Sequence, residues 1–164
     1  MPTLRWIFPA LAAIAALLLL PSTAIAAPGY TDQVQGIEYA ATATVGKFSG
    51  TATGPLPGAW NAIVVHKPLR PGVAIPITGG SVTLYSRRAL TGRFVEGTVS
   101  PINTPTACAN KRFNVSGRLA FEGGGTGTFS VVLTHLRTQL RSNCLTYGAT
   151  VVGTLAVKTR SAMA

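Results

Sequence analysis

Acidic residues are scarce in this chain of 164 residues, which has four Asp and Glu residues against fourteen Lys and Arg residues. A pair of carboxylates for glycoside hydrolysis would have to come from Glu38, Glu96 and Glu122, which fall on different expected strands and turns. A Ser-His-Asp set would need Asp32, which is expected to precede the first strand. The sequence therefore gives no support to either kind of hydrolytic site.

Metal ligands are also few, because the chain has two His and two Cys residues. His66 and His135 have no carboxylate beside them in the sequence, so no metal site is expected. The chain has no phosphate-binding loop, no dinucleotide fingerprint and no basic-aromatic strand signature of an RNA-binding sheet. We expect no cofactor and no specific nucleic-acid partner.

The N-terminal segment has the pattern of an export signal. Arg5 supplies a positive charge, residues 7–20 are apolar, Pro21 ends the run, and Ala24 and Ala26 are the small residues that a signal peptidase needs. The apolar run is short for a membrane span, and no stop-transfer charges follow it. We predict a signal peptide at residues 1–26, cleaved after Ala26, and a secreted, periplasmic or extracellular protein with no remaining membrane span. An uncleaved N-terminal anchor is the alternative.

The chain that remains after cleavage has 138 residues, 164 minus 26, which suits one domain at residues 27–160 with a tail at 161–164. Its net charge is about +9, because cleavage removes one of the fourteen cations. Cys108 and Cys144 are the only cysteines, and an oxidising compartment favours a disulfide between them. A free thiol or a thiolate metal ligand is the alternative.

The secondary structure is expected to be all β. Apolar residues alternate with polar ones in short runs, separated by Gly, Pro, Ser and Asn, and no window has a helical period. Gly46 and Lys47 fit a two-residue hairpin turn. Eight strands are predicted, at residues 35–45, 48–53, 60–66, 80–86, 91–100, 111–121, 126–137 and 145–158.

Eight antiparallel strands with one apolar face each require closure. We predict a single-domain up-and-down β-barrel, with a two-sheet β-sandwich as the alternative. Gly117 and Gly153 lie on apolar strand faces, which is typical of bends in a tight barrel. Gly-Thr repeats at residues 50–54 and 125–129 resemble the strands of allene-oxide-cyclase-like and dirigent-like barrels. The resemblance implies a barrel and carries over no functional residue.

The two ends of such a barrel differ. Short connections, at residues 54–58, 87–90 and 122–125, gather at one end, and long ones, at residues 67–79, 101–110 and 138–144, gather at the other. Loops on a rigid sheet commonly carry recognition, so the long-loop end is the candidate site. No acidic residue is expected at the long-loop end. Seven cations are expected there: Lys47, Lys67, Arg70, Lys111, Arg112, Arg137 and Arg141.

The histidines are expected at the same place. His66 and His135 close the third and seventh predicted strands in phase with apolar residues, so both are predicted to point into the barrel mouth. Trp60 and Tyr147 are predicted to line the apolar interior. The structural alternative for each is a core or rim residue, and for the loop cations a solvated charge.

Three functions follow from these expectations. The leading hypothesis is a non-catalytic barrel that binds an anionic or amphipathic ligand at the basic mouth, through His66, His135, Arg112, Arg137, Arg141, Trp60 and Tyr147. The second is an envelope-associated structural or adhesion module whose basic surface binds acidic polymers. The third is a small isomerase-like or cyclase-like enzyme that uses a histidine with Tyr147.

Overall fold

The computed structural model describes residues 29–102 and 108–158. The signal peptide predicted at residues 1–26 and the tail at 161–164 lie outside these ranges. Within the described ranges there is no helix that could cross a lipid bilayer.

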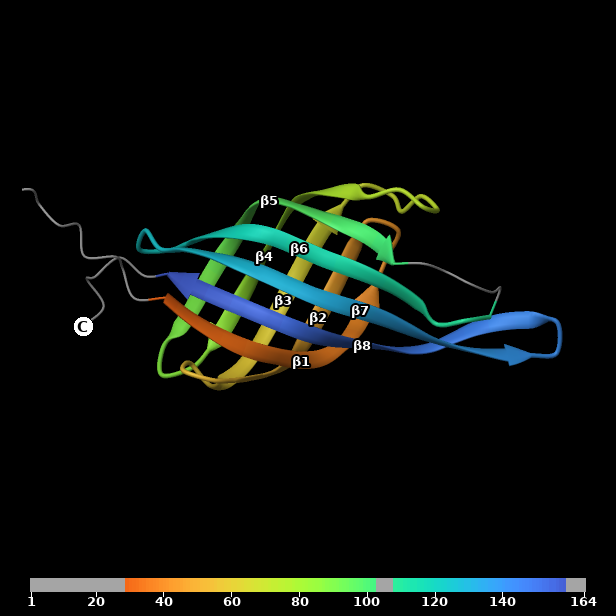
Figure 1. Cartoon of the computed structure of the whole chain (residues 1–164), viewed down its shortest axis with the longest axis horizontal. Helices are drawn as coiled ribbons and strands as arrows, with labels where there is room; N and C mark the ends of the chain where they lie inside the picture. The colour runs from red at the N-terminus through yellow and green to blue at the C-terminus, as the bar shows by residue number, and fades with distance from the viewer. Residues whose placement is uncertain (1–28, 103–107, 159–164) are drawn as a thin grey trace, which may run out of the picture.

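Eight antiparallel strands close into a barrel in which each strand pairs with its neighbours in sequence (Figure 1). β1 and β8 close the ring, with Gly29 opposite Lys158. This confirms the predicted up-and-down barrel and not the sandwich. The strands are β1 (Gly29–Ala41), β2 (Val45–Thr53), β3 (Gly58–His66), β4 (Ile75–Tyr85), β5 (Ala89–Ile102), β6 (Lys111–Phe121), β7 (Thr126–Leu140) and β8 (Asn143–Lys158).

The barrel interior is filled by side chains, as the alternating pattern requires. Trp60 is 1% exposed, and its ring centroid lies 5.7 Å from that of Phe129. The Trp60 indole N–H donates to the backbone carbonyls of Gln35, at 3.2 Å, and Thr51, at 3.1 Å. Burial therefore leaves its one polar atom paired, and Trp60 is a core residue.

The two glycines predicted at bends do face a crowded interior. A Cβ atom on Gly117 would lie 2.6 Å from the Phe94 ring, and one on Gly153 would overlap the backbone carbonyl of Ser130. Gly117 is thus the position that admits Phe94 to the core. Gly153 lets β8 approach β7 more closely than any side chain would allow.

The first hairpin differs from the prediction. β1 ends at Ala41, and the turn comprises residues 42–44, whereas Gly46 and Lys47 lie in β2. The Thr42 hydroxyl accepts the backbone N–H groups of Thr44, at 3.3 Å, and Val45, at 3.1 Å. The turn is therefore stabilised by hydrogen bonds to a threonine side chain, whereas the sequence pattern predicts a turn formed by Gly46 and Lys47.

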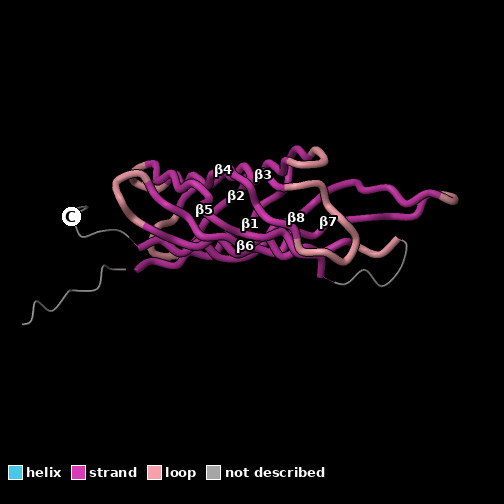
Figure 2. The backbone as a smooth tube through the Cα atoms, turned by 90° about the horizontal axis from the view of Figure 1, so that it is seen from above, coloured by secondary structure: helices cyan, strands magenta, loops and turns pink. Residues whose placement is uncertain are grey.

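The last hairpin also differs. Residues 138–144 were predicted as a long loop, but β7 and β8 continue as a paired ribbon to Leu140 and Asn143, and the turn is only Arg141 and Ser142. Arg141 adopts a positive φ of 56° in this turn. β6 pairs with β7 only as far as His135, and β1 pairs with β8 only as far as Thr150. The hairpin therefore projects beyond the rest of the barrel, as both views show (Figures 1 and 2).

Asp32 lies within β1, whereas the sequence pattern predicts that it precedes the first strand. It is 0% exposed, and its Oδ1 accepts the backbone N–H of Leu56 at 2.8 Å. Its Oδ2 has no hydrogen-bond partner among the described residues. Because β1 begins at Gly29, Asp32 falls on the inward face at the end of the barrel opposite the histidines.

Candidate functional site

The long-loop end is strongly cationic. It comprises the connections that follow β1, β3, β5 and β7, and the seven predicted cations lie on those connections or on the adjoining strand ends. Six of them are exposed, and Arg137 is half-buried and engaged in an interaction. The placement agrees with the prediction, because the strands follow one another around the barrel as expected.

The two histidines line the same recess inside this end. His66 is the last residue of β3, and His135 lies on the inward face of β7, five residues before that strand ends. Both line one small recess, together with Glu38 and the rings of Phe48 and Phe113. His66 Nδ1 donates to the backbone carbonyl of Lys67 at 2.7 Å, which leaves its Nε2 as the acceptor in the neutral ring.

Glu38 corrects the prediction that no acidic residue lies at this end. Its Oε2 is 2.8 Å from His135 Nε2, and the two side chains are 8% and 22% exposed. Glu38 reaches the recess because β1 ends at Ala41, only three residues later, and because even-numbered residues of β1 face inward. Its pairing with His135 leaves no unpaired acidic side chain among the described residues of the long-loop end.

Gly46 makes room for this pair. A Cβ atom at residue 46 would lie 2.8 Å from Glu38 Oε1 and 2.7 Å from the Phe48 ring. Gly46, which the sequence predicts as a turn residue, therefore faces inward from β2. Its lack of a side chain leaves space for the Glu38 carboxylate. The nearby ring of Phe113 lies 5.4 Å, centroid to centroid, from that of His135 and covers it on the core side.

The recess is too small for an organic ligand of ordinary size. Its volume is about 50 Å³, enough for a few water molecules, whereas ligand pockets commonly measure roughly 300–1,000 Å³. Trp60 lies in the filled core and does not line it. Tyr147, predicted to line the interior, is 67% exposed on the projecting hairpin. The structure thus brings the two histidines together and separates both aromatic residues from them.

The predicted disulfide is confirmed. Cys108 and Cys144 are bonded, with their Cα atoms 5.3 Å apart. Cys144 lies on the projecting hairpin opposite Gln139, so the bond ties the hairpin to the connection between β5 and β6. Asn110 Oδ1 adds a second tie by accepting the backbone N–H of Arg137 at 2.9 Å.

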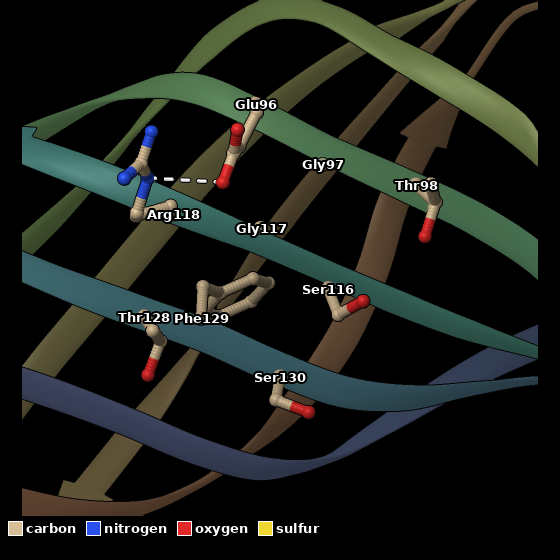
Figure 3. Close-up of a pocket in the computed structure, with 9 residues that line it drawn as sticks. All are labelled: Glu96, Gly97, Thr98, Ser116, Gly117, Arg118, Thr128, Phe129 and Ser130. Atoms are coloured by element: carbon tan, nitrogen blue, oxygen red, sulfur yellow. Dashed lines mark ion pairs between the residues drawn. The ribbon is translucent and has the colours of Figure 1, made fainter.

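A wide depression lies on the outer wall of the barrel (Figure 3), and it shares no lining residue with the recess. It spans β5, β6 and β7, has a volume of about 670 Å³, and is open to solvent. Figure 3 shows hydroxyl groups spread over it, with the exposed Arg118–Glu96 ion pair, 3.0 Å long, at one edge. The hydroxyl groups belong to Thr98, Ser116, Thr128 and Ser130. The polar groups of this surface are therefore neutral hydroxyl groups and one solvent-exposed ion pair.

The described residues contain no group of three or more His, Cys, Asp and Glu side chains placed to hold a metal ion. Glu38 and His135 form a carboxylate–imidazole pair able to exchange a proton, but the recess gives a substrate little space beside it. The remaining distinctive feature is the group of six exposed cations at the long-loop end. Comparisons with protein families, curated proteins and solved structures find no match for this chain.

Proposed function

We propose that this protein is an exported, non-catalytic β-barrel that binds an anionic polymer or surface at its long-loop end. The binding groups are the cations on the outside of that end. The interior serves as a packed scaffold. This proposal combines the basic mouth of the leading sequence hypothesis with the surface binding of the second.

The cluster of cations at the long-loop end is the observation that supports it. Six exposed cations and the half-buried Arg137 belong to the long-loop end, and the only carboxylate among the described residues of that end is 8% exposed and paired with His135. A surface of one sign attracts oppositely charged partners and raises their association rate. Because each connection at this end has a cation on it or on an adjoining strand end, an extended polyanion would contact several of them at once.

The filled interior argues for contact on the outside. A recess of about 50 Å³ holds no ligand of the size that the leading hypothesis requires. The confirmed disulfide is consistent with an oxidising compartment, and hence with export, where acidic envelope polymers are the expected partners.

The test measures binding of dextran sulfate by the purified chain, with Arg112→Ala/Arg141→Ala as the altered protein. Both side chains are exposed at the long-loop end. Each cation near an anionic surface contributes about 1 kcal/mol, so the double substitution should cost about 2 kcal/mol and weaken binding roughly thirtyfold at low ionic strength. Added salt should weaken the parent's binding by screening.

Arg87→Ala/Arg88→Ala is the matched control. It removes the same charge from the exposed turn between β4 and β5, at the opposite end of the barrel. The control should bind nearly as well as the parent. Equal losses in the two double variants would show that net charge alone drives binding, and the assignment to the long-loop end would be wrong.

The Glu38–His135 pair is the one observation that favours the enzyme hypothesis. Tyr147, the partner that the hypothesis named, is on the projecting hairpin and does not line the recess. Acid–base catalysis would therefore depend on the histidines and Glu38 alone, acting on a group small enough to enter. The cationic surface has the stronger support.

A further inference from the structure

The outer wall beside the projecting hairpin carries an exposed apolar stripe. Its members are between 46% and 67% exposed, and all belong to β1, β7 or β8. They account for six of the eleven large apolar side chains found exposed among the described residues. The apolar stripe consists of Ile37, Tyr39, Leu140, Leu145, Tyr147 and Val152.

Strand register brings these residues together. Val152 is opposite Gln35, and Ile37 is opposite Thr150, so Ile37 and Val152 are diagonal neighbours on the outer face. Leu145 is opposite Thr138, two residues before Leu140, so the two leucines share a face of the hairpin. Along β8 the stripe runs from the barrel wall onto the hairpin, in the region where β1, β8 and β7 lie side by side (Figure 1).

Exposed cations border the stripe on its long sides and at its tip. Arg112 of β6 is opposite Thr134 of β7, and Lys47 of β2 is opposite Ala40 of β1. Arg141 occupies the turn at the tip of the hairpin. An apolar surface bordered by cations matches the interface of a bilayer, where anionic headgroups lie above acyl chains and Tyr side chains are enriched.

We propose that the hairpin and the apolar stripe dock on a membrane surface that contains anionic lipids. This inference rests on the proposed function and names its partner class. The paired ribbon extends five residues beyond the last β6–β7 pair, which is roughly 17 Å at the rise of a β-strand. That length exceeds the depth of roughly 5–10 Å to which interfacial segments enter a bilayer. The Cys108–Cys144 bond holds the hairpin in place for insertion.

The bordering charges favour an anionic lipid surface over a second copy of the chain or a soluble polyanion as the partner of the stripe. A second copy docked on the same stripe would bring the bordering cations of the two copies, Arg112, Lys47 and Arg141, close to one another, at a cost in repulsion. A soluble polyanion would contact the cations and leave the leucines in water. An anionic lipid surface uses both the cations and the apolar side chains.

The experiment compares binding to two probes, dextran sulfate and vesicles of phosphatidylcholine with phosphatidylglycerol, using co-sedimentation for the vesicles. Leu140→Ser/Leu145→Ser should bind vesicles at least tenfold more weakly than the parent and bind dextran sulfate equally well. An unchanged far-ultraviolet circular dichroism spectrum should show that the variant is folded. Tyr85→Ser/Val95→Ser is the matched control, because it removes exposed apolar side chains from β4 and β5, outside the stripe.

The outcomes distinguish the two proposals. If the leucine variant binds vesicles as tightly as the parent, or if vesicles of phosphatidylcholine alone bind equally well, the lipid inference is overturned and the polymer result still stands. If the leucine substitutions instead abolish a dimer seen by sedimentation and the parent ignores vesicles, the stripe is a contact between copies. If Arg112→Ala/Arg141→Ala alters neither probe's binding, the proposed function itself fails.

Discussion

Glu38 and His135 pair across the mouth of the barrel, with a distance of 2.8 Å between Glu38 Oε2 and His135 Nε2. They belong to β1 and β7, which are separated in the sheet by β8. The contact therefore links two strands that share no backbone hydrogen bonds. It closes the interior at the end where the cations are exposed.

A double-mutant cycle should detect this link. Glu38→Ala and His135→Ala remove the two partners singly and together, and residues in direct contact commonly couple by about 0.5–3 kcal/mol. We expect a coupling of about 1–2 kcal/mol in the free energy of unfolding, measured by urea denaturation, because both side chains are largely buried.

The exposed Arg118–Glu96 pair is the control for that cycle. Its side chains are 60% and 64% exposed, and solvent screening reduces such pairs to less than about 1 kcal/mol. A coupling for Glu38 and His135 no larger than the one for Glu96 and Arg118 would contradict the structural role given to the mouth pair.

Gly153→Ala should destabilise the barrel. The new methyl group would overlap the backbone carbonyl of Ser130. Because this neighbour is backbone, the overlap can be relieved only if β8 shifts relative to β7. Overpacking of this kind costs about 1–3 kcal/mol, which urea denaturation would measure as a lower midpoint. Gly79→Ala is the control, because its Cβ atom would meet nothing within 4 Å. Similar losses for the two variants would be inconsistent with a close approach at Gly153.

Trp60→Phe tests the buried indole hydrogen bonds. The substitution keeps an aromatic ring beside Phe129 but leaves the carbonyls of Gln35 and Thr51 without their shared donor. We expect a loss of about 2 kcal/mol in the free energy of unfolding, from the lost hydrogen bonding and the smaller ring.

Tyr85→Phe is the comparison, since the Tyr85 hydroxyl accepts only an exposed hydrogen bond from Asn61, at 3.1 Å. Its expected effect is within about 0.5 kcal/mol. A Trp60→Phe protein as stable as the parent would mean that the indole N–H contributes nothing to the fold. Circular dichroism should follow the unfolding, because Trp60 is the only tryptophan after residue 26 and its removal abolishes the fluorescence signal.

Removing the disulfide should loosen the hairpin first. Cys108→Ser/Cys144→Ser opens a loop with a sequence separation of 36 residues, and the chain-entropy relation gives a loss of about 3–4 kcal/mol. Hydrogen exchange should accelerate most at residues 136–148, which have no neighbouring strand beyond their own hairpin partner. Uniform acceleration over all eight strands would show that the bond stabilises the barrel as a whole and has no particular effect on the hairpin.

Several elements of the fold were predictable because they depend on local pattern. The predicted bounds of β6 match the structure, since Phe113, Val115 and Leu119 alternate with polar residues between clear turn signals. The predicted up-and-down order of strands is confirmed, and the assignment of the cations to one end depends on that order. Inward alternation likewise placed both histidines on the interior face.

The turns were harder to predict, because a glycine can mark either a turn or a strand position where a side chain would not fit. Gly46 matched a turn signal, but its missing side chain serves the packing of Glu38 and Phe48. The true turn depends on the Thr42 hydroxyl, which forms two hydrogen bonds to the backbone. At the other hairpin, polar residues suggested a loop, yet strand pairing extends to Leu140 because β7 and β8 pair with each other beyond the barrel rim.

The sequence by itself determined an all-β chain of eight strands, a disulfide between its only two cysteines, and a cationic end. These features depend on residue type, alternation and chain order. Only the tertiary structure decided that Glu38 reaches His135, that the interior is filled, and that the apolar stripe lies between cations on the outer wall. Alternation identifies the face on which a side chain lies. Its depth in the barrel and its neighbours on other strands depend on register and closure, which arise only when all eight strands pack together.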